Sequence, residues 1–134
     1  MTEREINALC DRVRQTAYAI HLYLGNGHLE KVYENALRIE LIKLGHKVKQ
    51  QEPINVTYEG HIVGEYFADL WVDEIVVLEI KAVQMLATIH EVQLVNYLVA
   101  TGIDTGLVLN FGSSVQVRRK FREYTAKPLL NSIL

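Results

Sequence analysis

Two acidic residues and a lysine are the part of this chain whose types and spacing could do chemistry. Asp69 lies in the strand-like run 66–72, and Glu79 and Lys81 follow the apolar run 75–78. Side chains alternate along a strand, so Glu79 and Lys81 point to the same side of a sheet. Burying such charges is costly without a metal or ion pairing. Two carboxylates against one ammonium leave an unbalanced charge, which favours a bound cation over the alternative of a plain ion-pair cluster.

The length of the turn between the two runs decides whether the acids meet. A two-residue loop of Asp73 and Glu74 would place Asp69 opposite Leu78, and the two carboxylates would then face opposite sides. A three-residue loop, or one bulge, places Asp69 directly across from Glu79, with Cα atoms roughly 4.5–5.5 Å apart. We predict the odd-length turn, because a shift of one residue moves every side chain to the other face.

The elements that position these residues can be outlined from the spacing of apolar side chains. Apolar residues recur every three or four positions over about 3–24 and 28–44, which predicts two amphipathic helices. A third helix is expected over about 89–100, ended by Gly102. The order ααβββαββ predicts an α/β sandwich with a mixed central sheet flanked by helices. The expected strands are 48–58, 62–72, 75–82, 105–111 and 115–121.

Local signals add detail to the first hairpin and to the second helix. Pro53 demotes the middle of strand 48–58 to a sheet edge or a bulge. Glu59 and Gly60 form a tight turn signal, and Gly64 is a candidate bulge. In the second helix the residues expected to face inward are Leu29, Val32, Ala36, Leu37, Leu41 and Leu44.

Two of the expected helices carry further polar candidates. Glu30 opens the second helix, and Glu34 is a weaker rival that is better explained as a solvated residue. In the third helix Gln93 and Tyr97 are four positions apart and share a face. Each has an ordinary alternative: Glu30 stabilises the helix dipole, Gln93 is a polar helix residue, and Tyr97, like Tyr33, packs with a polar tip.

Composition restricts the class of protein. The chain has 134 residues, 49% of them apolar, and a net charge of −2, which predicts one domain, 1–134, with its own core. This charge provides no global attraction to nucleic acid or to an anionic membrane. The single cysteine, Cys10, cannot form an internal disulfide, and no apolar run approaches the ~18 residues of a membrane span. With no signal-peptide pattern at its start, we expect a soluble cytoplasmic protein without a membrane partner.

One dense basic run occurs near the end of the chain, at Arg118, Arg119, Lys120 and Arg122. On an edge strand it could contact nucleic-acid phosphates. Basic side chains equally protect a sheet edge from pairing with another chain.

The motifs together carry a family resemblance. Residues 27–33 spell G-x-x-E-x-x-Y, and the chain resembles the GxxExxY family of the PD-(D/E)XK nuclease-like superfamily. Asp69 matches the aspartate of that superfamily, and residues 79–81 match its (D/E)-x-K. The helix motif of Gln93 and Tyr97 is similar to the Q-x-x-x-Y of RecB-like nucleases.

The resemblance implies both a fold and a set of roles. A restriction-endonuclease-like core over about 28–111 is implied, with the helix at 3–24 outside it. The implied cofactor is Mg²⁺ or Mn²⁺, and DNA is the implied substrate, with RNA possible. Lys81 would position the attacking water, and Gln93 would hydrogen-bond a metal-bound water or the DNA backbone. The implied metal ligands are Asp69, Glu79, the carbonyl of Ile80 and Glu30, and the implied nucleic-acid contacts are Tyr97, Arg118, Arg119 and Lys120.

Three functions compete at this stage. The first is a metal-dependent nuclease, favoured by the intact acidic pair and lysine. The second is a non-catalytic nuclease-fold module that binds nucleic acid or a protein partner, favoured by the net charge of −2. The third is a structural or assembly protein with a vestigial charged cluster. Small members of the superfamily often act as dimers, and the first helix offers an apolar surface, so a homodimer is expected.

Overall fold

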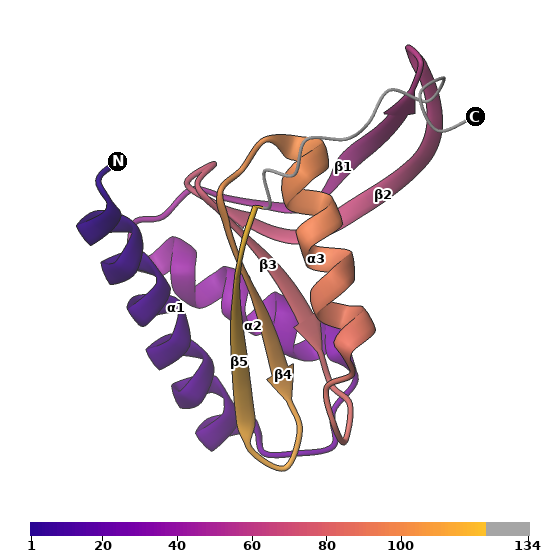
Figure 1. Ribbon diagram of the computed structural model, residues 1–134. Helices are drawn as coiled ribbons and strands as arrows, with labels where there is room; N and C mark the ends of the chain where they lie inside the picture. The colour runs from indigo at the N-terminus through magenta and orange to yellow at the C-terminus, as the bar shows by residue number, and fades with distance from the viewer. Residues whose placement is uncertain (123–134) are drawn as a thin grey trace.

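The computed structural model describes residues 1–122 as a central sheet with helices on both faces (Figure 1). The element order is ααβββαββ, which confirms the predicted fold class. Residues 123–134 of the expected single domain lie outside the described residues. The elements are α1 (Glu3–Leu24), α2 (Glu30–Lys43), β1 (Val48–Tyr58), β2 (His61–Val72), β3 (Val76–Lys81), α3 (Thr88–Thr101), β4 (Thr105–Phe111) and β5 (Val115–Phe121).

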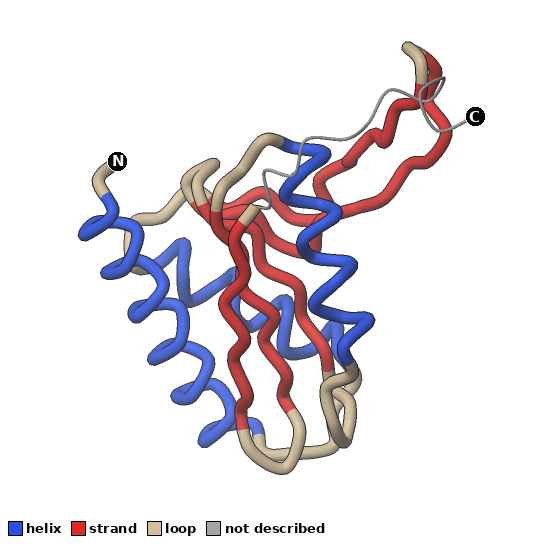
Figure 2. Tube along the Cα trace, in the orientation of Figure 1, coloured by secondary structure: helices blue, strands red, loops and turns tan. Residues whose placement is uncertain are grey.

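The sheet is mixed and follows the order of the chain, β1-β2-β3-β4-β5. Among the described strands only β3 and β4 pair in parallel, and α3 makes the crossover between them. The helices α1 and α2 cover one face of the sheet, and α3 covers the other (Figure 2). Among the residues that the structure describes, no helix has the length and apolar character needed to cross a bilayer.

Alternating side chains on β3 divide the core into two clusters. Leu78 and Ile80 pack with α1 and α2, whereas Val77 packs with α3. Because neighbouring side chains on a strand point to opposite faces, Glu79 and Lys81 follow Val77 toward the α3 side. The buried strand thus delivers the acid and the lysine to one face, as their spacing predicted.

The loop between β2 and β3 has an odd length, which confirms the predicted turn. It consists of residues 73–75, between the paired strand ends. The last pair of the β2–β3 ladder is Leu70 with Leu78. The next row in the same register brings Asp69 opposite Glu79. The two strands stop pairing at this row, so both carboxylates lie at the point where β2 leaves β3.

Beyond that row, β1 and β2 continue as a two-stranded arm that stands out from the body (Figure 1). Its tip is the expected two-residue turn, in which Glu59 and Gly60 both have positive φ, 49° and 80°. The register shifts beside Gly64, which confirms the bulge. Pro53 lies in β1, which is an edge strand of the sheet. Proline is tolerated in edge strands because they pair on one side only.

The buried face of α2 agrees with the expected one only in part: Leu37 and Leu41 are buried as predicted, but other positions differ. The helix begins at Glu30, and its core side is formed by Tyr33, Glu34, Leu37 and Leu41. The expected inward positions Leu29, Val32 and Leu44 are instead 80%, 39% and 50% exposed. The prediction was wrong at these positions because the face of α2 that packs on the core is the one that carries Tyr33. The ring of Tyr33 stacks on the ring of Phe111, with 4.5 Å between the centroids.

The spacing between α3 and the sheet depends on a glycine in β4. A Cβ on Gly106 would lie 2.8 Å from Cδ1 of Leu94, which is fully buried and has no room to move. We expect Gly106→Ala to lower the free energy of unfolding by about 1–3 kcal/mol, the usual cost of overpacking, measured by urea denaturation. Gly64→Ala is the control, because its Cβ would meet only the half-exposed ring of Tyr66, at 3.3 Å. Equal losses in the two variants would contradict the prediction.

Candidate active site

Where the β2–β3 pairing ends, the backbone N–H groups of the two strands donate to the acidic side chains instead of to backbone carbonyls. The backbone N–H of Ile80 donates to Oδ2 of Asp69 over 2.8 Å. The backbone N–H of Asp69 donates to Oε1 of Glu79 over a longer 3.4 Å. Each carboxylate therefore lies against the strand that carries the other, and the two acids are held side by side.

Burial and mutual repulsion disfavour the charged forms of both acids. Glu79 is only 5% exposed. Burial, with the neighbouring charge of Asp69, raises the pKa of Glu79 to about 9, although the charge of Lys81 opposes the shift. Burial also raises the pKa of Asp69, against the hydrogen bond from Ile80. Without a cation, the pair does not carry two full negative charges at neutral pH.

Lys81 influences the acids through its charge, without a direct ion pair in the described residues. Within residues 1–122, no ion pair or hydrogen bond joins its ammonium group to a partner. Its charge nevertheless lowers the pKa values of Glu30, Asp69 and Glu79 against the effect of burial. The half-buried lysine is therefore close to all three acids and not locked into a salt link with any of them, unlike the plain ion-pair cluster.

Glu34 is buried, which corrects the expectation of a solvated residue. Its side chain is 2% exposed and receives a hydrogen bond from Lys31 over 2.9 Å. Gln50 donates to the same carboxylate over 2.6 Å. The prediction failed because β1 crosses over the first turns of α2 and covers a helix face that would otherwise meet water.

Gln51 joins Glu34 to the acidic pair, and sequence analysis did not find it. Its side-chain amide donates to Oε2 of Glu34 and to Oδ1 of Asp69, both over 3.1 Å. Its backbone has a φ of 54°, an uncommon conformation for a residue with a side chain. Such strain concentrates at functional sites. The only signal in the sequence was a pair of glutamines just before Pro53.

Glu30 belongs to the same electrostatic group. It is half-buried in the first turn of α2. Burial raises the pKa of Glu30, the charges of Asp69 and Glu34 raise it further, and the charge of Lys81 lowers it. The helix thus places Glu30 near the acidic pair and not only at the helix dipole.

Helix α3, which covers the face to which Glu79 and Lys81 point, brings Gln93 and Tyr97 to the site, whereas Glu30 comes from α2. The amide of Gln93 donates to the Tyr97 hydroxyl over 2.7 Å. Burial, with the charge of Glu79, raises the pKa of Tyr97 to about 12. Tyr97 is 5% exposed, so it packs as expected, and its polar tip holds the amide of Gln93 in place.

The basic run lies apart from the acidic row. Arg118, Arg119 and Lys120 lie on β5, an edge strand that β4 separates from β3, and Arg122 follows the end of β5. Arg118 is exposed. Arg119 donates to Asn7 of α1 over 2.7 Å, and Lys120 pairs with Glu91 of α3 at 3.8 Å. The structure therefore does not bring these residues together with the acids, and their contact with nucleic acid stays a prediction.

Comparison with known proteins identifies the family. The sequence model of the PD-(D/E)XK nuclease superfamily matches residues 7–123. The chain belongs to this superfamily. Comparisons with curated proteins and with solved structures gave no match. The match spans every residue of the acidic site, and the narrower resemblance to the GxxExxY family stays a prediction.

The donor atoms of this superfamily member suit a hard divalent cation. Within the described residues, no three side chains of His, Cys, Asp or Glu are grouped closely enough to form a complete metal cage. Mg²⁺ does not require one, because it is usually bound by one or two carboxylates and completes its shell with water and phosphate. The half-buried carboxylate of Asp69 and the buried one of Glu79 lie side by side without an ion pair in the described residues and offer such an incomplete set of oxygens, so they fit the cation.

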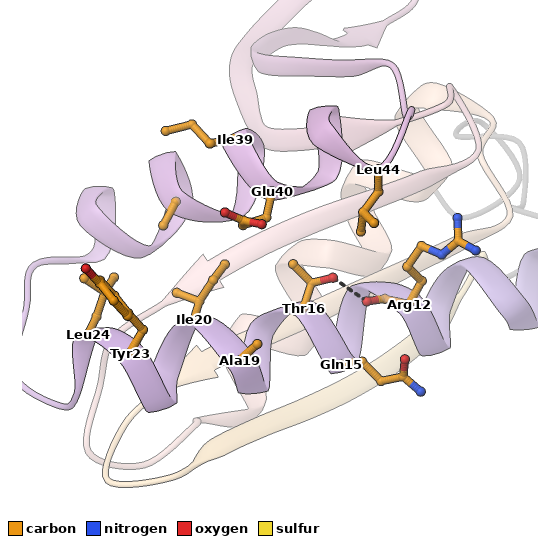
Figure 3. Close-up of a pocket in the computed structure, with 11 residues that line it drawn as sticks. Arg12, Gln15, Thr16, Ala19, Ile20, Tyr23, Leu24, Ile39, Glu40 and Leu44 are labelled. Carbon is orange, nitrogen blue, oxygen red and sulfur yellow. Dashed lines mark hydrogen bonds between the residues drawn. The ribbon is translucent and has the colours of Figure 1, made fainter.

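A separate groove of about 650 Å³ lies between α1 and α2 (Figure 3). Its lining is mostly apolar and includes Ile20, Leu24 and Leu44. It is on the α1–α2 side of the sheet, opposite the side to which Glu79 and Lys81 point. This surface takes no part in the acidic site, and the expected homodimer stays a prediction.

Proposed function

We propose that this nuclease-superfamily chain is a Mg²⁺- or Mn²⁺-dependent phosphodiesterase that cleaves DNA. One observation carries the proposal: Asp69 and the buried Glu79 are held side by side near Lys81, and no ion pair within residues 1–122 offsets their charge. A site of this kind is unfavourable for folding unless a cation is bound.

The position of each residue suggests its role in the proposed hydrolysis. Asp69 and Glu79 would hold the metal, with the carbonyl of Ile80, and with Glu30 directly or through a water. The bound cation supplies a water of lowered pKa and polarises a phosphoryl oxygen. Lys81, whose ammonium group has no ion pair in the part of the chain that the structure describes, would orient the attacking water and offset the developing negative charge.

Surrounding hydrogen bonds would keep the acids in place. Gln51 and the N–H of Ile80 both donate to Asp69, so its carboxylate keeps one orientation before any ligand arrives. Supporting bonds of this type commonly change metal affinity 10–100-fold when they are removed. Gln93, positioned by Tyr97, would bind a metal-bound water or the DNA backbone.

A non-catalytic module is the second candidate. Two of the predicted nucleic-acid contacts, Arg119 and Lys120, already have partners within the protein, and the net charge is −2. Such a module would have no need for two uncompensated acids beside a lysine. RNA is the alternative substrate within the first proposal, and the cytoplasm is the proposed compartment.

Metal removal provides the direct test. We expect the purified protein to cut supercoiled, linear or branched DNA, or RNA, with millimolar Mg²⁺ or Mn²⁺. Cleavage should stop in excess EDTA and return when the metal is restored, because the acids alone cannot generate the nucleophile. Gel electrophoresis of the products measures the rate. Unchanged cleavage in EDTA would contradict metal dependence, and an absence of cleavage on all substrates would favour the non-catalytic module.

A further inference from the structure

A second groove, of about 760 Å³, opens beside the acidic row. It lies between α3 and the β1–β2 arm, and its lining includes Gln93 and Tyr97. The same Tyr97 is near enough to Glu79 to feel the charge of that carboxylate. Tyr97 also packs in one cluster with Ala68, the chain neighbour of Asp69, so a ligand in this groove would be separated from the acidic row by Tyr97 alone.

The lining of this groove is uncharged. It contains no Asp, Glu, Lys or Arg side chain. Phosphate groups are usually bound by Arg and Lys, so the groove does not suit the nucleic-acid backbone. Asn96, which is exposed on α3, has no side-chain hydrogen-bond partner within residues 1–122. An open amide among apolar side chains suits a flat heterocycle with polar edges. The apolar part of the lining is Val56, Ile89, Val92, Val95, Val99 and Ala100.

An aromatic ring on β2 completes the groove. The ring of Tyr66 is 45% exposed and lies 5.6 Å from the ring of Tyr97 at an angle of 43°. Gly64 leaves space for it at the bulge, since a Cβ there would approach the ring to 3.3 Å. A half-exposed ring with free surface is the platform on which unpaired bases stack.

We propose that this groove holds one unpaired nucleobase of the strand whose phosphate lies at the acidic row. The ring of Tyr66 stacks on the base, and the amide of Asn96 hydrogen-bonds its polar edge. The inference rests on the proposed function and narrows its substrate, because a base inside a duplex is already stacked and paired. The preferred substrate is then single-stranded, or locally unpaired, next to the cut.

Binding without metal tests the groove separately from catalysis. In EDTA, fluorescence anisotropy would compare a short labelled single strand, as DNA and as RNA, with a duplex of the same sequence. The protein is expected to bind one of the single strands more tightly than the duplex, and the better strand identifies the source of the base. Tyr66→Ala should weaken this binding about 10-fold, the effect of one lost stacking contact. Tyr66→Phe should keep it, because the ring remains.

Two more variants make the result interpretable. Asn96→Ala changes an exposed helix residue without a fold contact and should weaken single-strand binding about 5-fold, as for one lost hydrogen bond. Tyr18→Ala removes a ring of the same 45% exposure from α1, outside the groove, and should change nothing. The proposal is overturned if the duplex binds as tightly as both single strands. It is also overturned if Tyr66→Ala and Asn96→Ala both bind like the parent.

The groove and the hydrolytic site can fail separately. Metal-dependent cleavage without any preference for single strands would remove the groove and leave the phosphodiesterase. Tyr66-dependent binding of single strands, with no cleavage under any condition, would remove the phosphodiesterase and leave the groove.

Discussion

Replacing Lys81 with alanine is expected to reduce the rate of metal-dependent DNA cleavage by about 10²–10⁴-fold, the range for losing a group that positions a proton transfer. The ammonium has no ion-pair partner within the described residues and acts on Glu30, Asp69 and Glu79 from a distance. Its loss therefore breaks no salt link that supports the fold. Initial rates of cleavage with saturating Mg²⁺, from parent and variant at equal concentration, measure the effect.

Two readouts separate a role in positioning water from a role in folding or metal binding. Lys43→Ala is the matched control, because this lysine is exposed and its one ion pair within residues 1–122 is with Glu40 on the surface of α2. It should cleave like the parent. The rise in melting temperature caused by Mg²⁺ should survive in Lys81→Ala, since the carboxylates remain. Cleavage at the parental rate by Lys81→Ala would exclude the proposed mechanism and indicate a contaminating nuclease.

Replacing Glu79 with glutamine is expected to stabilise the metal-free protein at pH 8 and to abolish both cleavage and metal-induced stabilisation. Glutamine has the shape of the uncharged acid, which is the form that burial favours at this position. A rise in melting temperature of at least about 4 °C is expected, which corresponds to roughly 1 kcal/mol in a domain of this size. Cleavage is lost because one of the two metal-binding carboxylates is gone.

The same residue should make stability depend on pH. The pKa of Glu79 is about 9 in the folded protein and 4.5 by default. Below pH 4.5 both states hold the proton, and the shift has no effect. Between pH 4.5 and 9 the folded state binds more protons than the unfolded state, so the stability of the metal-free protein falls as pH rises. Burial of Asp69, whose pKa is also raised, adds to this trend.

Metal should oppose that trend. A cation binds the deprotonated acids, so its affinity and its stabilising effect grow as pH rises. Thermal melting from pH 5 to 9 should show stability falling with pH in EDTA and falling less in Mg²⁺, so that the stabilisation by Mg²⁺ grows with pH in the parent, whereas Glu79→Gln should show a weaker slope in EDTA. The control is Glu65→Gln, an exposed position on β2 that should melt like the parent. A parent that melts identically with and without Mg²⁺ at pH 8 would contradict metal binding at this site.

Much of the fold followed from short-range patterns. Apolar spacing placed α1 at Glu3–Leu24, and glycines ended α1 and α3, because periodicity and backbone freedom act within a few residues. The inward face of α2 could be predicted only in part from these patterns. It depends on the stack of Tyr33 on Phe111, a contact between residues far apart in the chain that apolar counting does not capture.

The candidate site shows the same division. The pairing of Asp69 with Glu79 was predictable, since strand alternation and turn length decide it. The parts contributed by Glu34 and Gln51 were not. A glutamate on an amphipathic helix is usually solvated, and only the path of β1 over α2 shows that this one is covered and linked to Asp69.

The length of the loop at the tip of the β2–β3 hairpin determines whether the acidic site forms. Exposed tips are where domains usually accept insertions and deletions most easily. Here the number of residues at 73–75 decides which side of the sheet receives the acid on the incoming strand. A homologue that keeps both acids but has one residue more or fewer at this tip would be expected to fold without a cation site. Conservation of motif letters would then overstate activity, and hairpin length would be the better guide.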